Sequence, residues 1–159
     1  MRLPLIDRRR LLAFGAALPF LGACSAAPAE AKSFPKGKTD AQWRKLLTRD
    51  QFYVLREAGT ERAFTSPLDR EKRKGTFVCA GCANPLYASV HKFDSGTGWP
   101  SFWQAVDKSA VGTSTDYLIG YPRTEVHCAD CGGHLGHIFA DGPKPVSYTH
   151  LTLPTNREV

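Results

Sequence analysis

The sequence lacks a hydrophobic segment long enough to cross a membrane. Its longest apolar run, residues 11–23, has 13 residues, whereas a membrane-spanning helix needs about 20. It also lacks a strong charge imbalance beyond the amino terminus, because 17 basic residues face 14 acidic ones from Cys24 onward. Nucleic acids are bound through dense basic surfaces, and no basic stripe with interleaved aromatic residues is present. We therefore expect no nucleic-acid partner.

Long helical segments that alternate with strands are also missing, which disfavours a parallel α/β sheet. The 11 prolines and 14 glycines divide the chain into short elements, so a helix bundle is disfavoured too. Hydrophobic residues make up 42% of the chain and charged residues 23%, a composition that excludes wholesale disorder and collagen-like repeats. A length of 159 residues is sufficient for one domain with a sizeable core.

Residues 1–23 have the pattern of an export signal. Arg8, Arg9 and Arg10 precede the apolar run, and small residues follow it. These arginines also resemble a twin-arginine signal, which would carry a folded, metal-loaded protein, and an ordinary secretory signal is the alternative. We therefore expect an exported protein, located in the periplasm or the cell envelope.

Two cleavage patterns compete after this signal. Residues 21–24 resemble a lipobox, which would place a lipid anchor on Cys24 and make the protein a lipoprotein. Residues 29–31 resemble a small-x-small cleavage site, which would release a soluble protein. Our interpretation favours the lipid anchor at Cys24. Residues 24–38 are rich in alanine, proline and lysine, and we predict a linker there.

Two short helices are predicted at the start of the domain. Asp40 can cap the first helix through its carboxylate. Thr48 and Gln51 form a capping-box pattern for the second, and Gly59 suits its end. The apolar residues at helical spacing are Trp43, Leu46 and Leu47 in the first helix and Phe52, Val54 and Leu55 in the second.

From residue 76 onward the chain consists of short segments rich in β-branched and aromatic residues, separated by glycine and proline. We predict strands at residues 76–78, 113–121, 124–127 and 135–139. The predicted fold class is therefore mainly β, a compact antiparallel β domain behind two N-terminal helices.

Four cysteines form two Cys-x-x-Cys pairs: Cys79 with Cys82, and Cys128 with Cys131. Two such pairs supply the tetrahedral four-sulfur shell that zinc prefers. The 45 residues between the pairs exceed the about 15–20 of a compact zinc finger, so the metal would join two distant parts of one domain. We predict one structural Zn²⁺ per chain, worth about 10–16 kcal/mol of apparent folding free energy. Disulfides, a redox-active pair and a catalytic zinc are the alternatives.

Two longer motifs are more specific. Residues 93–102 have the sequence FDSGTGWPSF, and residues 131–143 have the sequence CGGHLGHIFADGP. Together with the cysteine pairs and TERAF at residues 60–64, they closely resemble peptide-methionine (R)-S-oxide reductases of the MsrB type, over about residues 39–145. The resemblance implies an antiparallel β fold of two small sheets with a structural zinc. It also implies that the R epimer of methionine sulfoxide in oxidised proteins is returned to methionine, as protein repair under oxidative stress.

The resemblance assigns Trp99 and Phe102 to the substrate-binding site. Trp99 would hold the methyl group of the substrate, and an indole face suits a polarizable thioether. Glycines precede Trp99 and a proline follows it, so the loop is flexible on one side and stiff on the other. A buried core position for Trp99 is the alternative.

The resemblance also assigns catalytic roles to His134, His137 and Asp141. The two histidines are three residues apart, so a regular strand would point them to opposite faces, and a bulge at Gly136 could bring both toward one cleft. A neutral imidazole could provide the proton for the departing sulfoxide oxygen. Asp141 would orient a histidine or polarise water. Packing or stray metal binding by the histidines, and turn formation by Asp141, are the alternatives.

Two positions depart from the family pattern. Thr97 stands where many relatives have a resolving cysteine, so recycling would need an external thiol such as a thioredoxin-like reductant. The nucleophilic cysteine is expected near Leu151, but no cysteine follows Cys131. Because a hydroxyl group cannot form a sulfenic acid, we expect the chain as written to be inactive as a reductase.

Residues 146–159 do not continue the family pattern. We interpret them as a non-native tail that replaces the end of the domain at residues 39–145, with genuine divergence as the alternative. A zinc-stabilised module that binds a sulfoxide or another small ligand without turnover is the alternative function. We expect the protein to be a monomer.

Overall fold

The computed structural model describes residues 33–140 and 156–158. The predicted export signal, both cleavage patterns and most of the predicted linker lie outside the described residues, as do Asp141 and Leu151. Among the described residues, no helix has the length and hydrophobicity that crossing a membrane requires.

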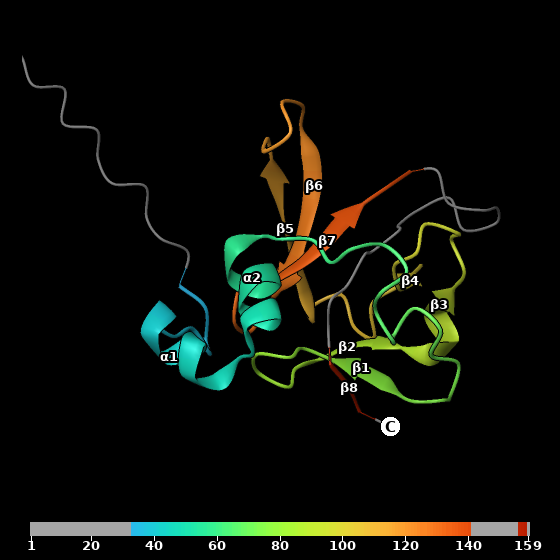
Figure 1. Ribbon diagram of the computed structural model, residues 1–159, viewed down its shortest axis with the longest axis horizontal. Coiled ribbons are helices and arrows are strands. Elements are labelled where there is room, and N and C mark those ends of the chain that lie inside the picture. The colour runs from blue at the N-terminus through green and yellow to red at the C-terminus, as the bar shows by residue number, and fades with distance from the viewer. Residues whose placement is uncertain (1–32, 141–155, 159) are drawn as a thin grey trace, which may run out of the picture. The chain divides into compact units, whose positions relative to one another are not determined.

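The two predicted helices are confirmed as α1 (Asp40–Leu46) and α2 (Arg49–Glu57) (Figure 1). Each begins with a capping box, in which a threonine hydroxyl accepts from a backbone N–H and a glutamine side chain accepts from the threonine N–H. In α2 these residues are Thr48 and Gln51, as predicted. In α1 they are Thr39 and Gln42. The prediction that Asp40 is the cap is wrong, because Asp40 is the first helical residue. At that position its negative charge interacts favourably with the positive end of the helix dipole.

The end of α2 differs from the prediction by one residue. Ala58, and not Gly59, takes the left-handed conformation, with φ of 52°. Gly59 follows it and donates its N–H to the carbonyl of Tyr53 at 3.0 Å. A Cβ atom on Gly59 would lie 2.3 Å from the Tyr53 ring, so glycine is required there by space.

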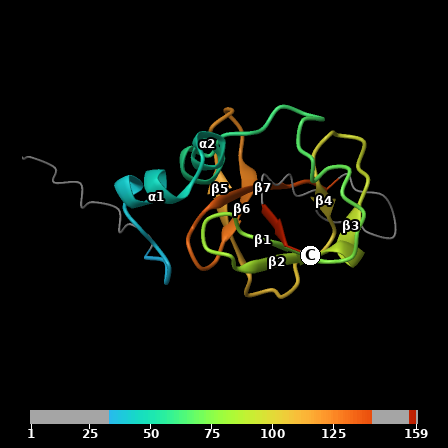
Figure 2. The ribbon, with the colours of Figure 1, turned by 60° about the horizontal axis from the view of Figure 1, so that its bottom comes forward.

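The strands that the structure describes form three small antiparallel sheets. Strands β1 (Thr76–Val78), β2 (Pro85–Ala88) and β8 (Asn156–Glu158) form the first, in the order β2-β1-β8 (Figure 2). Strands β3 (Lys92–Phe93) and β4 (Ser101–Phe102) form the second, after the short 3₁₀ helix η1 (Ser89–His91). Strands β5 (Val111–Asp116), β6 (Arg123–Cys128) and β7 (His134–Ile138) form the third, in chain order. The mainly β, antiparallel class is therefore confirmed, with three described sheets where two were expected.

Three predicted strands coincide with β1, β6 and β7 to within one residue at each end. The predicted strand at residues 113–121 is too long, since β5 ends at Asp116. The chain turns there because Gly120 takes a φ of +87° and donates its N–H to the carbonyl of Tyr117 at 2.9 Å. Strands β2, β3 and β4 were not predicted, because segments of two to four residues carry no usable alternation.

The core joins the two helices to residues of all three sheets. Trp43 and Leu47 bury the inner side of α1, whereas Leu46, which was expected beside them, is 61% exposed. At the centre, Phe102 stacks on Tyr87 with 4.7 Å between ring centroids and meets the edge of Phe77 at 4.8 Å. Full burial of each such ring contributes about 1.5–3 kcal/mol. The third sheet and the loop before β4 are thus held against a common core.

Candidate active site and metal centre

The four cysteines of the two Cys-x-x-Cys pairs meet in one cluster. Their Sγ atoms all lie within 4.8 Å of one another, and the Cys79–Cys131 and Cys82–Cys128 Sγ distances are both 3.6 Å. Metal–sulfur bonds of about 2.3 Å in a tetrahedron would place the sulfurs about 3.8 Å apart, so the cluster fits one metal ion. A disulfide needs about 2.05 Å, and the four thiols are free in this structure.

Backbone hydrogen bonds form the two turns that present these thiols. The Asn84 carbonyl accepts the Cys79 N–H at 2.9 Å. The Gly133 carbonyl accepts the Cys128 N–H, also at 2.9 Å. The Asn84 side-chain amide also donates to Cys128 Sγ at 3.5 Å. The first turn joins β1 to β2 and the second joins β6 to β7. A metal here would therefore link the first sheet to the third, as the long cysteine spacing predicted.

A bulge in β7 places His134 and His137 on one face of the strand. The pairing of β7 with β6 leaves Leu135 as one extra residue between His134 and Gly136, and Gly136 takes a φ of 141°. An extra residue reverses the alternation of side chains, so residues three apart point the same way. The two rings are buried, with 5.3 Å between their centroids. The predicted bulge at Gly136 is confirmed.

Each of these histidines is hydrogen-bonded to a carboxylate from another strand of the same sheet. His134 Nδ1 lies 2.7 Å from Glu125 Oε1 of β6, and His137 Nε2 lies 2.7 Å from Asp116 Oδ2 of β5. Arg123 also donates to Asp116 Oδ2, at 2.6 Å. The carboxylates fix the orientation of both rings and determine which ring nitrogen carries a proton.

Hydrogen bonding keeps both carboxylates ionised. The backbone N–H of Leu118, followed by His137 and Arg123, lowers the pKa of Asp116 to about 2. Hydrogen bonds from His134 and, to a smaller extent, from Ser114 lower the pKa of Glu125 to about 2. Burial lowers the pKa of His137, and the charge of Arg123 acts in the same direction. At neutral pH His137 is therefore neutral, and its Nε2–H donates to the ionised Asp116.

Trp99 is held in its loop by the segment that carries the TERAF motif. Its indole N–H donates to the carbonyl of Glu61 at 2.8 Å, and the Phe64 N–H donates to the carbonyl of Gly98 at 2.7 Å. Gly98 has a φ of +86°, and a Cβ atom there would lie 2.8 Å from the Phe64 ring. The half-buried indole is thus fixed without being part of the buried core.

Phe102 does not reach a surface in this structure. Its side chain is fully buried, and its ring contacts are with Tyr87 and Phe77 in the core. Phe102 thus packs beneath the loop, and its contact with substrate stays a prediction. Figures 1 and 2 both show β7 running from α2 toward the side of the domain that holds β3 and β4. The histidine strand thus approaches the part of the fold that carries the Trp99 loop.

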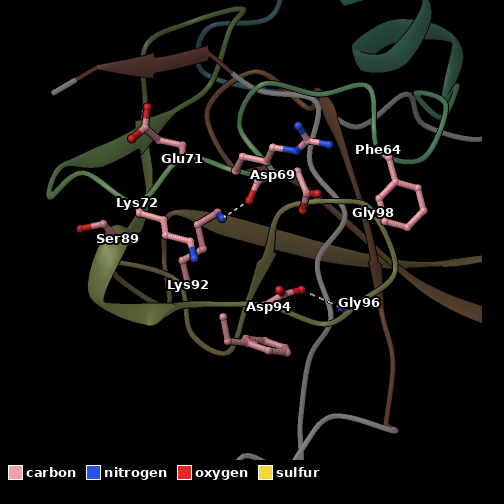
Figure 3. A pocket seen from close by; sticks show the side chains of 11 residues that line it. Phe64, Asp69, Glu71, Lys72, Ser89, Lys92, Asp94, Gly96 and Gly98 are labelled. Carbon is pink, nitrogen blue, oxygen red and sulfur yellow. Dashed lines mark hydrogen bonds between the residues drawn. The ribbon is translucent and has the colours of Figure 1, made fainter.

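A cavity of about 660 Å³ lies against the part of the Trp99 loop that precedes Trp99 (Figure 3). Gly96, Gly98 and Phe64 form part of its wall, and the remainder is mostly charged. Lys92 donates to the carbonyl of Asp69 at 2.6 Å, and the Asp94 carboxylate accepts the Gly96 N–H at 2.9 Å. Its lining residues include neither Trp99 nor the two histidines, so we do not assign it to the histidine site.

The roles of Asp116 and Glu125 were not predicted from the sequence. The pattern that could have indicated Glu125 is the alternation of Arg123, Glu125 and His127 in a predicted strand, since alternate residues share one face. Asp116 carried no comparable pattern, because the predicted strand continued past it. Asp141 and Leu151 lie outside the described residues, so the structure gives neither a position.

Comparison with known proteins places the chain in one family. Residues 47–152 match the SelR domain. A peptide methionine sulfoxide reductase MsrB of Agrobacterium fabrum is 52% identical over 108 residues, which cover 68% of this chain and 80% of that protein. The MsrB of Thiobacillus denitrificans is 53% identical over 108 residues, 68% of this chain and 82% of that protein. The chloroplastic peptide methionine sulfoxide reductase B1 of Oryza sativa is 50% identical over 107 residues, 67% of this chain and 50% of that protein.

The matched regions contain the Trp99 loop, both histidines and all four clustered cysteines. The sequence identity to these relatives is about 50%. It agrees with the motif resemblance, the antiparallel fold and the metal-compatible cysteine cluster. This chain belongs to the SelR-domain family of MsrB-type peptide methionine sulfoxide reductases.

Proposed function

We propose that this domain recognises the R epimer of methionine sulfoxide in oxidised proteins and is built to reduce it to methionine. The observation that carries the proposal is the histidine pair, which a bulge turns to one face and two ionised carboxylates hold in place. Each ring has one nitrogen bound to a carboxylate, so it can hydrogen-bond a sulfoxide oxygen and supply a proton to it when its second nitrogen is protonated.

The proposed roles follow from the positions of the residues. Trp99 offers a fixed indole face to the methyl group of the substrate. His134 and His137 act at the sulfoxide oxygen, and Asp141 assists them as the family resemblance implies. The reduction itself requires a thiolate that attacks the sulfoxide sulfur, takes the oxygen as a sulfenic acid and releases methionine.

That thiolate is missing from the chain as written, because its last cysteine is Cys131. We propose that the unchanged chain binds the sulfoxide but does not turn it over. The same observation favours the second candidate function, a binding module without catalysis. The reductase and the binding module predict different results when a cysteine is placed at the expected position.

The experiment installs that cysteine. Leu151→Cys should give dithiothreitol-driven reduction of a blocked methionine-R-sulfoxide, whereas the unchanged chain and the matched variant Thr149→Cys should give none. The product, the blocked methionine, is measured by liquid chromatography. Turnover by the unchanged chain that depends on His137 would contradict the proposed inactivity. A folded, sulfoxide-binding Leu151→Cys variant without turnover would favour the binding module.

We propose zinc as the metal of the cysteine cluster. Four thiolates in a tetrahedral arrangement are a donor set that zinc prefers, and they leave no open coordination position for catalysis. The ion would be structural, one per chain, because the turns that present the thiols belong to two different sheets.

The cellular setting is proposed from the sequence alone. The basic and apolar pattern of residues 1–23 supports export, and residues 21–24 support a lipid anchor at Cys24 in the envelope. Thr97 in place of a resolving cysteine supports recycling by an external thioredoxin-like reductant. We propose that the protein is a monomer and that its substrates are oxidised envelope proteins. Labelling with radioactive palmitate, with Cys24→Ser as the control, tests the anchor.

A further inference from the structure

Hydrophobic side chains gather at the turn between β5 and β6. Tyr117, Leu118, Ile119 and Tyr121 are 66%, 75%, 51% and 58% exposed, and we call these four residues the apolar tip. Figure 1 shows this hairpin projecting beyond α2. Turns are normally built from small polar residues. Four large exposed hydrophobic residues on one short turn are typical of a binding surface.

The apolar tip is fixed to the histidine site by a single carboxylate. Asp116 Oδ1 accepts the backbone N–H of Leu118 at 2.6 Å. Asp116 Oδ2 lies 2.7 Å from His137 Nε2. A bond from Gly120 N–H to the Tyr117 carbonyl closes the turn itself. A polypeptide whose sulfoxide occupies the site at His137 would therefore have its neighbouring residues close to a rigid hydrophobic surface.

We propose that the apolar tip binds the apolar residues that flank the oxidised methionine in an unfolded or extended polypeptide. This inference rests on the proposed function. Methionine is among the residues most often buried in folded proteins. In a fully buried strand, or on the apolar face of a helix, it has other apolar residues close to it in sequence. Its sulfoxide becomes accessible when the surrounding chain is exposed. Hydrophobic contact is non-directional, and it therefore suits substrates whose flanking sequences differ.

The described start of the chain lies at the end of β6 that is remote from the apolar tip. Phe34 packs on His127, with 5.6 Å between ring centroids, and the Lys36 N–H donates to the Asp130 carbonyl at 2.7 Å. The described segment thus begins near the Cys128 end of β6. The apolar tip adjoins the Arg123 end of that strand, about 17 Å away along its length.

The test measures peptide binding, because the unchanged chain is not expected to turn over. Three short fluorescein-labelled peptides are compared by fluorescence anisotropy. One carries methionine-R-sulfoxide between leucine and valine residues, one carries it between serine and glycine residues, and one carries unoxidised methionine between leucine and valine. The proteins are the unchanged chain, the double variant Leu118→Ser with Ile119→Ser, the separate variant Tyr121→Ser, and Val90→Ser as the matched control. Val90 is 72% exposed and lies in η1, outside the tip.

We expect the unchanged chain to bind the apolar-flanked sulfoxide about ten-fold more tightly than the polar-flanked one. The tip variants should abolish this ratio without changing the Kd of the polar-flanked sulfoxide, and Val90→Ser should leave both Kd values unchanged. Thermal unfolding should be the same for all variants, because the substituted side chains are exposed.

A ratio that survives in both tip variants would overturn the proposal. So would tip-dependent flotation with vesicles of phosphatidylcholine and phosphatidylglycerol, or a tip-dependent dimer in sedimentation velocity, in the absence of a flank effect. Failure of the proposed function gives a different result. Tip-dependent binding that is equal for the oxidised and unoxidised apolar peptides would support the tip and contradict sulfoxide recognition.

Discussion

Asp116 is a single side chain that serves three groups at once. Its carboxylate accepts from His137, from Arg123 and from the backbone of Leu118. Because an ionised carboxylate only accepts hydrogen bonds, it fixes the proton of neutral His137 on Nε2 and leaves Nδ1 as an acceptor. The protonation of the histidine site is thus determined by a residue that need not touch the substrate.

Asp116→Asn should therefore change His137 without changing the fold. Loss of the negative charge removes a contribution that raises the pKa of His137, so this pKa should fall further below its usual value. The measurement is an NMR titration of the imidazole resonances. Binding of the polar-flanked sulfoxide peptide should weaken by about ten-fold. Asp107→Asn is the control, because within residues 33–140 the Asp107 side chain bonds only to Ser109. An unchanged His137 pKa in Asp116→Asn would contradict the argument.

Glu125 makes stability depend on pH. Its pKa of about 2 lies below the usual value near 4.5, so its contribution is fully present above about pH 5 and is lost as the pH falls toward 2. After allowance for solvent screening, this contribution is about 1–2 kcal/mol. Urea unfolding at pH 6 and pH 2.5 should show that Glu125→Gln flattens the dependence by this amount. Glu57→Gln, at an exposed ion pair with Arg44, should leave it unchanged, and equal slopes for the two variants would refute the assignment.

At the scale of elements, the bulge in β7 decides whether two histidines three residues apart can share one face. Gly136→Ala places a Cβ on a φ of 141°, a conformation that L side chains rarely adopt. The free energy of unfolding should fall by about 1–3 kcal/mol. The histidine resonances should shift as the strand relaxes toward regular pairing.

The control for this bulge is a second strained glycine that lies outside β7 and outside the turn that Asp116 holds. Gly96 has a φ of +70° and no heavy atom within 4 Å of an added Cβ. Gly96→Ala should therefore lose stability through backbone strain alone, with the histidine resonances in place. Histidine shifts of the same size in both variants would show that the bulge has no special role.

Elements differ in how much of them the sequence could predict. The Thr48–Gln51 capping box was predicted because its partners are three residues apart. A bulge at Gly136 was considered because it would bring two histidines three residues apart to one side. The Asp40 cap was wrong because Thr39 offered a better local partner for Gln42. The contacts of Asp116 and Glu125 with the histidines were missed because they depend on strand register, which joins residues 9 and 21 positions apart.

At the scale of the whole domain, the metal-compatible cluster and the histidine site share two strands. Strand β6 carries Glu125 and ends at Cys128, and β7 begins at His134 just after Cys131. Tightening the turn between them therefore also fixes the register of β6 and β7, on which the hydrogen bond between the His134 and Glu125 side chains depends. We expect the metal to stabilise the fold and, through it, the geometry of the site.

Removal of the metal should then unfold the domain and abolish binding together. Elemental analysis should find one zinc per chain. Dialysis against a strong chelator, or Cys128→Ser, should lower the thermal midpoint by at least about 10 °C, because several kcal/mol of folding free energy are lost. Cys24→Ser is the matched control, since Cys24 is not one of the four clustered cysteines, and it should keep its zinc and its midpoint. A metal-free chain that melts at the original temperature and still binds the polar-flanked sulfoxide peptide would show that the three sheets and the histidine pair hold together without the ion.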